Sequence, residues 1–183
     1  MRIVVSGTHA SGKSTLITDF ARLHPEFTVL PDPFELMDEA WDEPSAASFA
    51  AQLRISAARL DPGETAGDLI AERGPIDFLA YVLALEELTG GSGGRELVRR
   101  SAAMTREALQ HVDLLVVLPL IRAHDIAPAP DEHLELRIAM NDVLLELIDD
   151  SDIVGERAEV VEITGDRDHR LASLEALVLG SIR

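Results

Sequence analysis

The chain has 183 residues, a length typical of one domain with a full hydrophobic core. It contains no cysteine, which excludes disulfides and thiolate metal sites, and its formal net charge of −17 disfavours binding to DNA or RNA. Met1 is followed directly by a short apolar run and a glycine-rich motif, without room for a signal peptide, and no apolar run approaches the roughly 20 residues of a membrane span, so we expect a soluble, cytoplasmic protein with no membrane contact.

Short apolar runs alternate with segments of helical spacing along the chain. The runs predict strands over residues 2–6, 27–30, 68–72, 112–118 and 159–163. The other segments predict helices over residues 14–23, 75–88, 95–111, 134–148 and 167–179, and over a region that Ser45 caps and residues 61–63 end. This alternation is typical of an α/β protein, in which helices cover both faces of a parallel sheet. Because the glycine-rich segment 90–94 is short, we expect a loop there and a single domain over residues 1–183.

A P-loop pattern, G-x-x-x-x-G-K-[ST], lies between the first predicted strand and the first predicted helix. Lys13 is the only lysine of the chain, and its compact ammonium suits a place between β- and γ-phosphates better than the fork of an arginine does. Gly7 and Gly12 allow backbone angles that turn N–H groups inward, the helix N-terminus favours anions, and Ser14 offers a hydroxyl to Mg²⁺. We therefore predict a three-layer P-loop NTPase fold with a five-stranded sheet. Its predicted triphosphate site comprises Gly7, His9, Ala10, Ser11, Gly12, Lys13, Ser14 and Thr15.

The composition favours ATP over GTP as the nucleotide. GTPases usually read guanine with an N-K-x-D element, and this element cannot exist here because the only asparagine is Asn141 and the only lysine is Lys13.

Three charged residues follow predicted strands, at the sheet edge where ligands bind in open parallel sheets. Asp32 follows the second strand, and Glu72 and Arg73 lie at the end of the third strand and directly after it. Phosphoryl transfer needs a metal, a positioned acceptor and positive charge, so Glu72 is a candidate for holding Mg²⁺, Arg73 for contacting phosphate, and Asp32 for accepting the proton of the acceptor hydroxyl. The alternatives are a turn residue between two prolines for Asp32 and a loop salt bridge between Glu72 and Arg73.

These segments resemble those of known kinases. Val29-Leu30-Pro31-Asp32-Pro33 is similar to the "EP" segment of deoxynucleoside kinases, and Glu72-Arg73-Gly74-Pro75-Ile76-Asp77 to their "ERS" or "DRS" segment. With Ala80-Tyr81, the second segment also resembles small AAA-like P-loop kinases that include ribosylnicotinamide kinase domains. The resemblance implies that Asp32 is the general base, Glu72 a metal-side carboxylate and Arg73 an acceptor or phosphate contact.

The resemblance also implies that Gln52, on the helix after the second strand, reads the acceptor base. Phe49 and Trp41 lie nearby in sequence and are candidates for stacking on a ring. The alternatives are a solvent-facing glutamine and a phenylalanine that only packs in the core.

A lid is expected over about residues 121–133, after the fourth strand, because small P-loop kinases close such a segment over the phosphates. Arg122 and Arg137 flank this segment, and Arg122 is our candidate for reaching the transferring phosphoryl group. The alternative for Arg137 is an ordinary residue of the helix surface, and His124 and His133 are expected on the surface. In related kinases the loop after the last strand wraps adenine.

Two residues of that loop are our adenine-side candidates in this chain. Gly165 allows close backbone approach, and Arg167 is a candidate for stacking on the base; the alternative is a plain turn capped by Asp166.

We expect an ATP- and Mg²⁺-dependent phosphoryl transfer to a hydroxyl of a small-molecule acceptor, with a nucleoside-like acceptor favoured. The alternatives are a regulatory ATPase module that acts on a protein partner and a kinase that modifies an antibiotic or secondary metabolite. Residues 131–168 carry 13 acidic side chains against three arginines, which predicts a solvated acidic face or a docking surface for a basic partner. A further alternative is a homodimer formed through the helices on either side of the glycine-rich segment 90–94.

Overall fold

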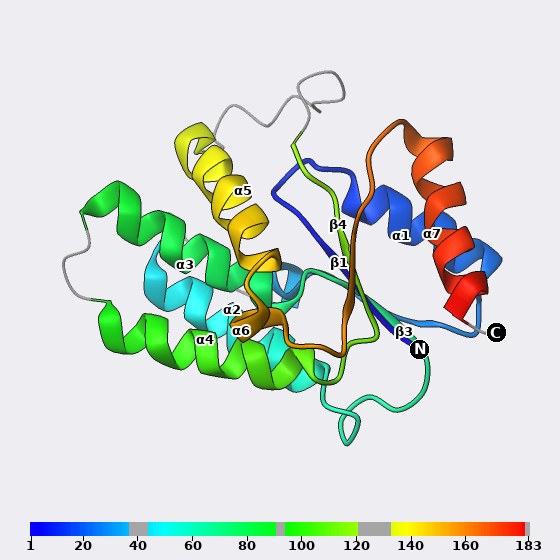
Figure 1. The fold of residues 1–183 in the computed structure, drawn as a ribbon, viewed down its shortest axis with the longest axis horizontal. Helices are drawn as coiled ribbons and strands as arrows, with labels where there is room; N and C mark the ends of the chain where they lie inside the picture. The colour runs from blue at the N-terminus through cyan, green and yellow to red at the C-terminus, as the bar shows by residue number, and fades with distance from the viewer. Residues whose placement is uncertain (37–43, 91–93, 121–132, 182–183) are drawn as a thin grey trace.

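The computed structural model describes residues 1–36, 44–90, 94–120 and 133–181. Five parallel strands form one sheet in the order β2-β3-β1-β4-β5 (Figure 1). The strands are β1 (Arg2–Ser6), β2 (Thr28–Leu30), β3 (Leu69–Glu72), β4 (Leu114–Val117) and β5 (Glu159–Glu162). In this order the P-loop strand β1 lies between β3 and β4, and Val5 pairs with Glu72 in register, so the P-loop begins beside the carboxyl end of β3.

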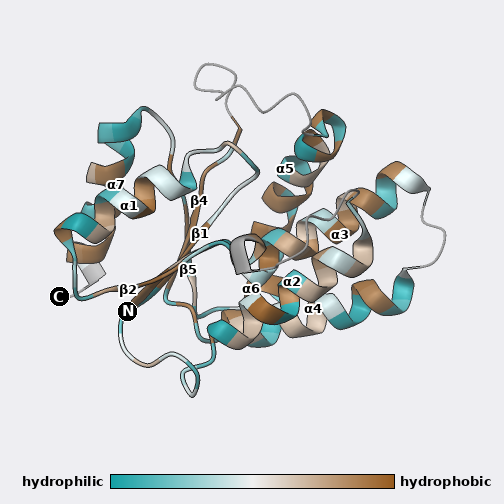
Figure 2. Ribbon diagram, turned by 180° about the vertical axis from the view of Figure 1, so that it is seen from behind, coloured by the Kyte–Doolittle hydropathy of each residue, from teal (hydrophilic) through white to brown (hydrophobic). Residues whose placement is uncertain are grey.

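Helices cover both faces of the sheet, as Figures 1 and 2 show. One face carries α1 (Lys13–Leu23) and α7 (Arg167–Ser181), which contact each other. The other face carries the larger group, which comprises α2 (Ala46–Arg59), α3 (Pro75–Thr89), α4 (Arg95–Leu109), α5 (Leu134–Ile148) and α6 (Ser151–Val154). A short 3-10 helix, η1 (Pro33–Leu36), follows β2.

Two separate apolar cores hold these layers together. Because side chains alternate across a strand, Val4 packs in the core beneath α2 to α6, whereas Ile3 and Val5 pack in the core beneath α1 and α7. The three central strands β1, β3 and β4 contribute apolar side chains to both cores, as expected for the buried middle of a parallel sheet.

The predicted fold class, with its five-stranded parallel sheet and helices on both faces, is confirmed. Ser45 caps α2 as predicted, because its hydroxyl accepts a hydrogen bond from the Ser48 amide at 3.1 Å. The pattern did not predict α6, which is four residues long, or η1, because one turn is too short to show helical periodicity. Among the described residues no helix is both long and apolar enough to cross a bilayer. The predicted lid lies outside the described residues, apart from His133.

Candidate active site

The P-loop joins β1 to α1 and has the geometry of a phosphate cradle. Gly7 has a φ of 148°, and a Cβ there would lie 2.8 Å from the Leu118 carbonyl oxygen, so this turn requires glycine. The Lys13 ammonium is buried and donates a hydrogen bond to the Thr8 carbonyl at 2.7 Å. Burial, followed by the charge of Arg73, lowers the pKa of Lys13 to about 7. An anionic ligand in the cradle would therefore favour the protonated form of this lysine.

A pocket opens at this loop, and we call it the phosphate pocket after its predicted ligand. All the predicted P-loop residues from His9 to Thr15 line it, together with Asp32, Phe34, Glu72 and Arg73. The Ser14 hydroxyl donates a 2.7 Å hydrogen bond to the Glu72 carboxylate, which brings the two predicted metal-side residues together. No group of three or more acidic or histidine side chains able to hold a metal occurs among the described residues. A hydroxyl and one carboxylate nevertheless fit Mg²⁺ in such a site, since Mg²⁺ keeps several waters and is completed by substrate phosphates.

Asp32, just after β2, and Arg73, just after β3, form a partly buried ion pair at the sheet edge. The Arg73 Nε donates to Asp32 Oδ2 at 2.6 Å, and the Phe34 amide donates to Asp32 Oδ1 at 3.0 Å. Burial acts to raise the pKa of Asp32, but the Arg73 charge and the Phe34 amide outweigh it, and the net pKa lies below the ordinary value. Asp32 is therefore ionised at neutral pH. The alternative of a Glu72–Arg73 salt bridge is wrong, because Arg73 pairs with Asp32 and Glu72 binds Ser14.

The Arg73 guanidinium also connects the end of β3 to the P-loop through hydrogen bonds. Its Nη1 donates to the Gly7 carbonyl at 3.0 Å, and its Nη2 lies 3.2 Å from His9 Nδ1. The backbone of Arg73 has a left-handed φ of 63°, which is uncommon for residues other than glycine. The side chain is 3% exposed. All three nitrogen positions thus hold groups of the site in place.

Asp77, in the first turn of α3, is a structural brace that the sequence analysis did not assign to the site. Its carboxylate is fully buried and accepts hydrogen bonds from the Gly7 amide (2.8 Å), the Ser6 hydroxyl (2.6 Å) and the Gly74 amide (2.8 Å). It joins the start of the P-loop to the turn between β3 and α3. Its place in the resembling segment, five residues after Glu72, was the available signal.

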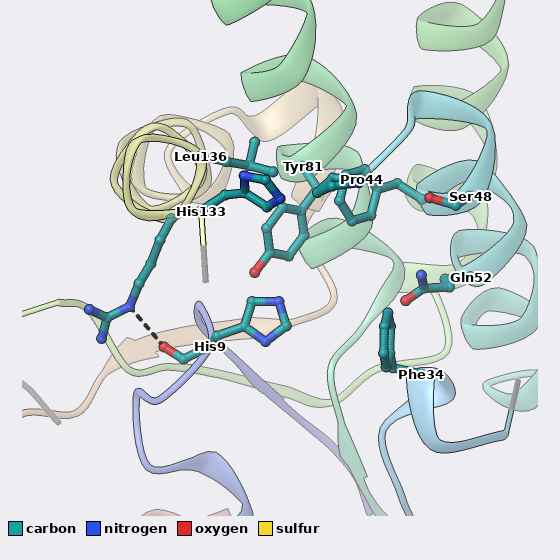
Figure 3. A pocket seen from close by; sticks show the side chains of 10 residues that line it. His9, Phe34, Pro44, Ser48, Gln52, Tyr81, His133 and Leu136 are labelled. Atoms are coloured by element: carbon teal, nitrogen blue, oxygen red, sulfur yellow. Dashed lines mark hydrogen bonds between the residues drawn. The ribbon is translucent and has the colours of Figure 1, made fainter. Parts of the chain in front are cut away.

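A second pocket adjoins the phosphate pocket, and His9 and Phe34 line both (Figure 3). Its empty volume, which includes space open to solvent, is about 670 Å³. Its other lining residues come mainly from α2, α3 and α5 and are Pro44, Ser48, Phe49, Gln52, Tyr81, His133, Leu136 and Arg137. We call this cavity the acceptor pocket, after the ligand predicted for Phe49 and Gln52.

The predicted ring contacts Phe49 and Gln52 both line the acceptor pocket. Gln52 is 2% exposed, so the alternative of a solvent-facing glutamine is wrong. Phe49 stacks on Tyr81, with ring centroids 4.7 Å apart, and so belongs to the core and to the pocket wall at once. Trp41 lies outside the described residues. Phe34, in η1, was missed because only the fold brings it to both pockets.

The helix α5 contributes two residues at the pocket mouth. Arg137 is 5% exposed, and its Nε donates to the His9 carbonyl at 3.1 Å, so the helix-surface alternative for Arg137 is wrong. His133 is exposed, as expected, but lines the acceptor pocket. Arg122 and His124 lie outside the described residues.

The loop between β5 and α7 differs from expectation at Arg167. The Arg167 guanidinium forms a two-pronged ion pair with Asp19 of α1, with both distances at 2.6 Å, and lies in neither pocket lining described above. Asp166 caps α7 by accepting from the His169 amide at 2.9 Å.

Arg170, one turn further along α7, was missed by the sequence analysis. It donates to the carbonyls of Gly165 and Ser11, at 2.9 and 2.6 Å, and thereby joins this loop to the P-loop. A contact across 159 residues of sequence gives no local signal.

Comparison with solved structures identifies similar folds. Deoxyadenosine kinase from M. mycoides with products dCMP and a flexible dCDP bound has a TM-score of 0.72 at 12% identity, over 98% of this chain and 100% of that one. The same enzyme with dCTP gives a TM-score of 0.70 at 14% identity, again over 98% and 100%. Thymidylate kinase from Candida albicans gives 0.68 at 17% identity, over 98% of this chain and 91% of that one.

Neither a family model nor a curated protein sequence matches the chain. The resemblance to deoxynucleoside kinases is thus supported at the level of structure, and that to ribosylnicotinamide kinases stays a prediction. At these identities the likeness establishes the architecture, and the chain has the fold of P-loop nucleoside and nucleotide kinases.

Proposed function

We propose that this protein is an ATP- and Mg²⁺-dependent kinase that phosphorylates a hydroxyl of a nucleoside-like small molecule. The observation that carries the proposal is the junction of two pockets. The phosphate pocket adjoins the acceptor pocket, and the ion pair of Asp32 with Arg73 lies at the phosphate side of that junction. A donor phosphate and an acceptor hydroxyl would meet beside an ionised carboxylate.

The P-loop residues would hold the triphosphate. The backbone amides of the loop and the Lys13 ammonium would bind β- and γ-phosphate oxygens, and Ser14 with Glu72 would hold Mg²⁺. When bound, Mg²⁺ neutralises charge that develops on the phosphates during transfer. We retain Arg122 as the proposed lid arginine, and Gly165 with Arg167 as proposed adenine contacts. For Arg167 to stack on the base, its pair with Asp19 would have to open.

In the proposed reaction the acceptor hydroxyl oxygen bonds to the γ-phosphorus, and the bond from this phosphorus to the bridging oxygen of ADP breaks. Asp32 accepts the hydroxyl proton. Arg73 holds Asp32 in place through the 2.6 Å contact and keeps the carboxylate ionised. This division makes Asp32 the proposed general base and Arg73 the residue that orients it.

The acceptor pocket supports a planar, nucleoside-like ligand. Phe34, Phe49 and Tyr81 offer aromatic surface, and the side-chain amide of Gln52, which is free of hydrogen bonds within the described residues, offers both a donor and acceptors. The structurally similar enzymes named above are a deoxyadenosine kinase, with deoxynucleotides bound, and a thymidylate kinase. The names of these enzymes and the deoxynucleotides bound to the first support the choice of a nucleoside-like acceptor.

The test is a product screen. The purified protein would be incubated with ATP, Mg²⁺ and a library of nucleosides and vitamins, and phosphorylated products detected by mass spectrometry. We expect a nucleoside monophosphate with wild type and none with Lys13→Ala, in a protein that keeps its fold by circular dichroism. Binding of ATP without transfer to any library member would contradict the proposal.

A further inference from the structure

His9 stands in the wall between the two pockets. It belongs to the P-loop, yet its ring projects into the acceptor pocket between Tyr81 and Phe34 (Figure 3). Its backbone carbonyl is fixed by Arg137 at 3.1 Å, and its Nδ1 lies 3.2 Å from Arg73 Nη2. The ring is therefore held from the phosphate side and presents its other edge to the acceptor.

The contact with Arg73 determines which ring nitrogen carries the proton. A guanidinium only donates, so His9 Nδ1 must accept, and a neutral ring then has its proton on Nε2. Burial, followed by the charges of Arg73 and Lys13, lowers the pKa of His9 to about 3, so the ring is neutral at physiological pH. No described residue accepts a hydrogen bond from Nε2, so the Nε2–H group is a donor for a ligand in the acceptor pocket.

The Tyr81 hydroxyl is an independent sign of a ligand contact. Tyr81 is 2% exposed, lines the acceptor pocket, and its ring centroid lies 5.6 Å from that of His9. Its hydroxyl oxygen is buried and makes no hydrogen bond of good geometry within the described structure, although the Arg73 side chain and the His9 backbone amide lie close enough to interact with it. Buried polar groups normally have partners, so such a group in the wall of a ligand pocket points to one supplied by the ligand. Burial also raises the pKa of this phenol, which keeps it protonated.

We propose that the His9 Nε2–H and the Tyr81 hydroxyl bind a second oxygen of the acceptor, next to the hydroxyl that receives the phosphoryl group. The inference rests on the proposed kinase function and narrows the acceptor class to alcohols with a neighbouring oxygen, such as a sugar. The pair lies at the phosphate end of the acceptor pocket, whereas Gln52 lies on the opposite wall from His133 (Figure 3). His9 and Tyr81 would then bind the sugar of the ligand, and Gln52 would bind its ring.

The test compares a 2′-deoxynucleoside with the matching 2′,3′-dideoxynucleoside, which lacks the second oxygen. We expect wild type to prefer the deoxynucleoside by about tenfold or more in kcat/KM, since one buried hydrogen bond has about that effect. In Tyr81→Phe and in His9→Leu this preference should fall several-fold towards one. His9→Gln keeps an acceptor and a donor and should recover much of it. His111→Phe, a change at a histidine between α4 and β4 and outside both pockets, is the matched control and should keep the wild-type preference.

The outcomes separate this inference from the proposed function. If wild type phosphorylates no library member, the kinase assignment fails. If wild type phosphorylates both nucleosides equally well, or the variants lower both rates in the same proportion, the kinase assignment stands and the role of His9 and Tyr81 is refuted. Tyr81→Phe removes only one oxygen atom, and its melting temperature would show that the fold is retained.

Discussion

Arg73 illustrates how one residue serves several parts of the candidate site. Its guanidinium holds the Asp32 carboxylate, which follows β2, and the Gly7 carbonyl and the His9 ring, which belong to the P-loop. Burial acts against its charged form, but the neighbouring acidic groups raise the pKa of Arg73, so it stays a cation. A lysine would keep the charge but not the fork that reaches three partners.

Replacing Asp32 by asparagine tests the proposed general base. We expect Asp32→Asn to lower kcat by about 10²- to 10⁴-fold, the usual contribution of a positioned proton acceptor. The affinity for ATP should change little, because the P-loop contacts remain. Steady-state kinetics and an ATP titration by calorimetry would measure the two effects.

The matched control is Asp32→Glu, which keeps a carboxylate and should retain more activity than Asp32→Asn. Both variants disturb the pair with Arg73, whose side chain is only 3% exposed, so their melting temperatures must be compared first. An unchanged kcat in a folded Asp32→Asn protein would remove Asp32 as the base.

His9 also makes a prediction about stability against pH. The pKa of His9 is about 3 in the folded protein, whereas an unfolded histidine titrates near 6.5. Between these values the unfolded state binds the extra proton, so this contribution to stability is lost as the pH falls from about 6.5 towards 3. At pH 5 the loss would reach at most about 2 kcal/mol.

Urea unfolding of wild type and His9→Gln at pH 7.5 and pH 5 would measure how much unfolding free energy the titration of His9 removes. Glutamine keeps an acceptor for Arg73 but does not titrate, so the variant should lose less stability at pH 5. Acid effects from the other groups are common to both proteins and cancel in the comparison. Equal losses would mean that His9 is not held neutral.

At the scale of elements, the turn from β3 to α3 carries several residues of the candidate site. Four residues of the site lie within six positions of this turn. Glu72 binds Ser14, and Arg73 holds Asp32. Gly74 approaches β1, and Asp77 accepts a hydrogen bond from the P-loop amide of Gly7. A Cβ on Gly74 would lie 2.7 Å from Val4 Cγ1 in the core. The turn therefore lies against β1 without space for one methyl group.

We expect Gly74→Ala to lower the free energy of unfolding by about 1–3 kcal/mol, because the added atom overpacks the contact with β1. The displaced turn would also move Asp77 and weaken ATP binding. Gly180→Ala is the control, since a Cβ there meets nothing within 4 Å and alanine favours a helix. Urea unfolding would compare the stability of both variants with that of wild type. Equal stability of Gly74→Ala and wild type would contradict the close packing of Gly74 against Val4.

The sequence predicted those features that have a local signature. Strand and helix positions follow from periodicity, and Asp32, Glu72 and Arg73 were predicted to meet because parallel strands end at one edge. Phe34 and Arg170 were missed as site residues because their contacts join segments distant in sequence. Arg137 was named only as a residue beside the lid, because its contact with His9 likewise joins distant segments. Arg167 was assigned to adenine from its place in the loop, whereas its partner Asp19 lies on a helix 148 residues earlier.

At the scale of the whole molecule, the net charge of −17 should make stability depend on salt. Like charges repel one another in the compact state, and added salt screens this repulsion. We expect the melting temperature at pH 7.5 to rise by about 2–4 °C between 0.02 and 0.2 M KCl, which corresponds to about 1 kcal/mol. Most of the rise should come below about 0.15 M, where the Debye length is still about 8 Å or longer.

A triple variant, Glu156→Gln, Glu159→Gln and Glu162→Gln, tests the source of this effect. All three carboxylates are exposed, lie on or beside β5, and have no hydrogen bond or ion pair within the described residues. Removing three negative charges from −17 leaves −14, so the variant should melt at a higher temperature than wild type in 0.02 M KCl and gain less from added salt. Scanning calorimetry would measure both proteins across the KCl series. A melting temperature that falls with salt would instead indicate that attractive pairs, such as Arg157 with Asp113, outweigh the repulsion among the acidic side chains.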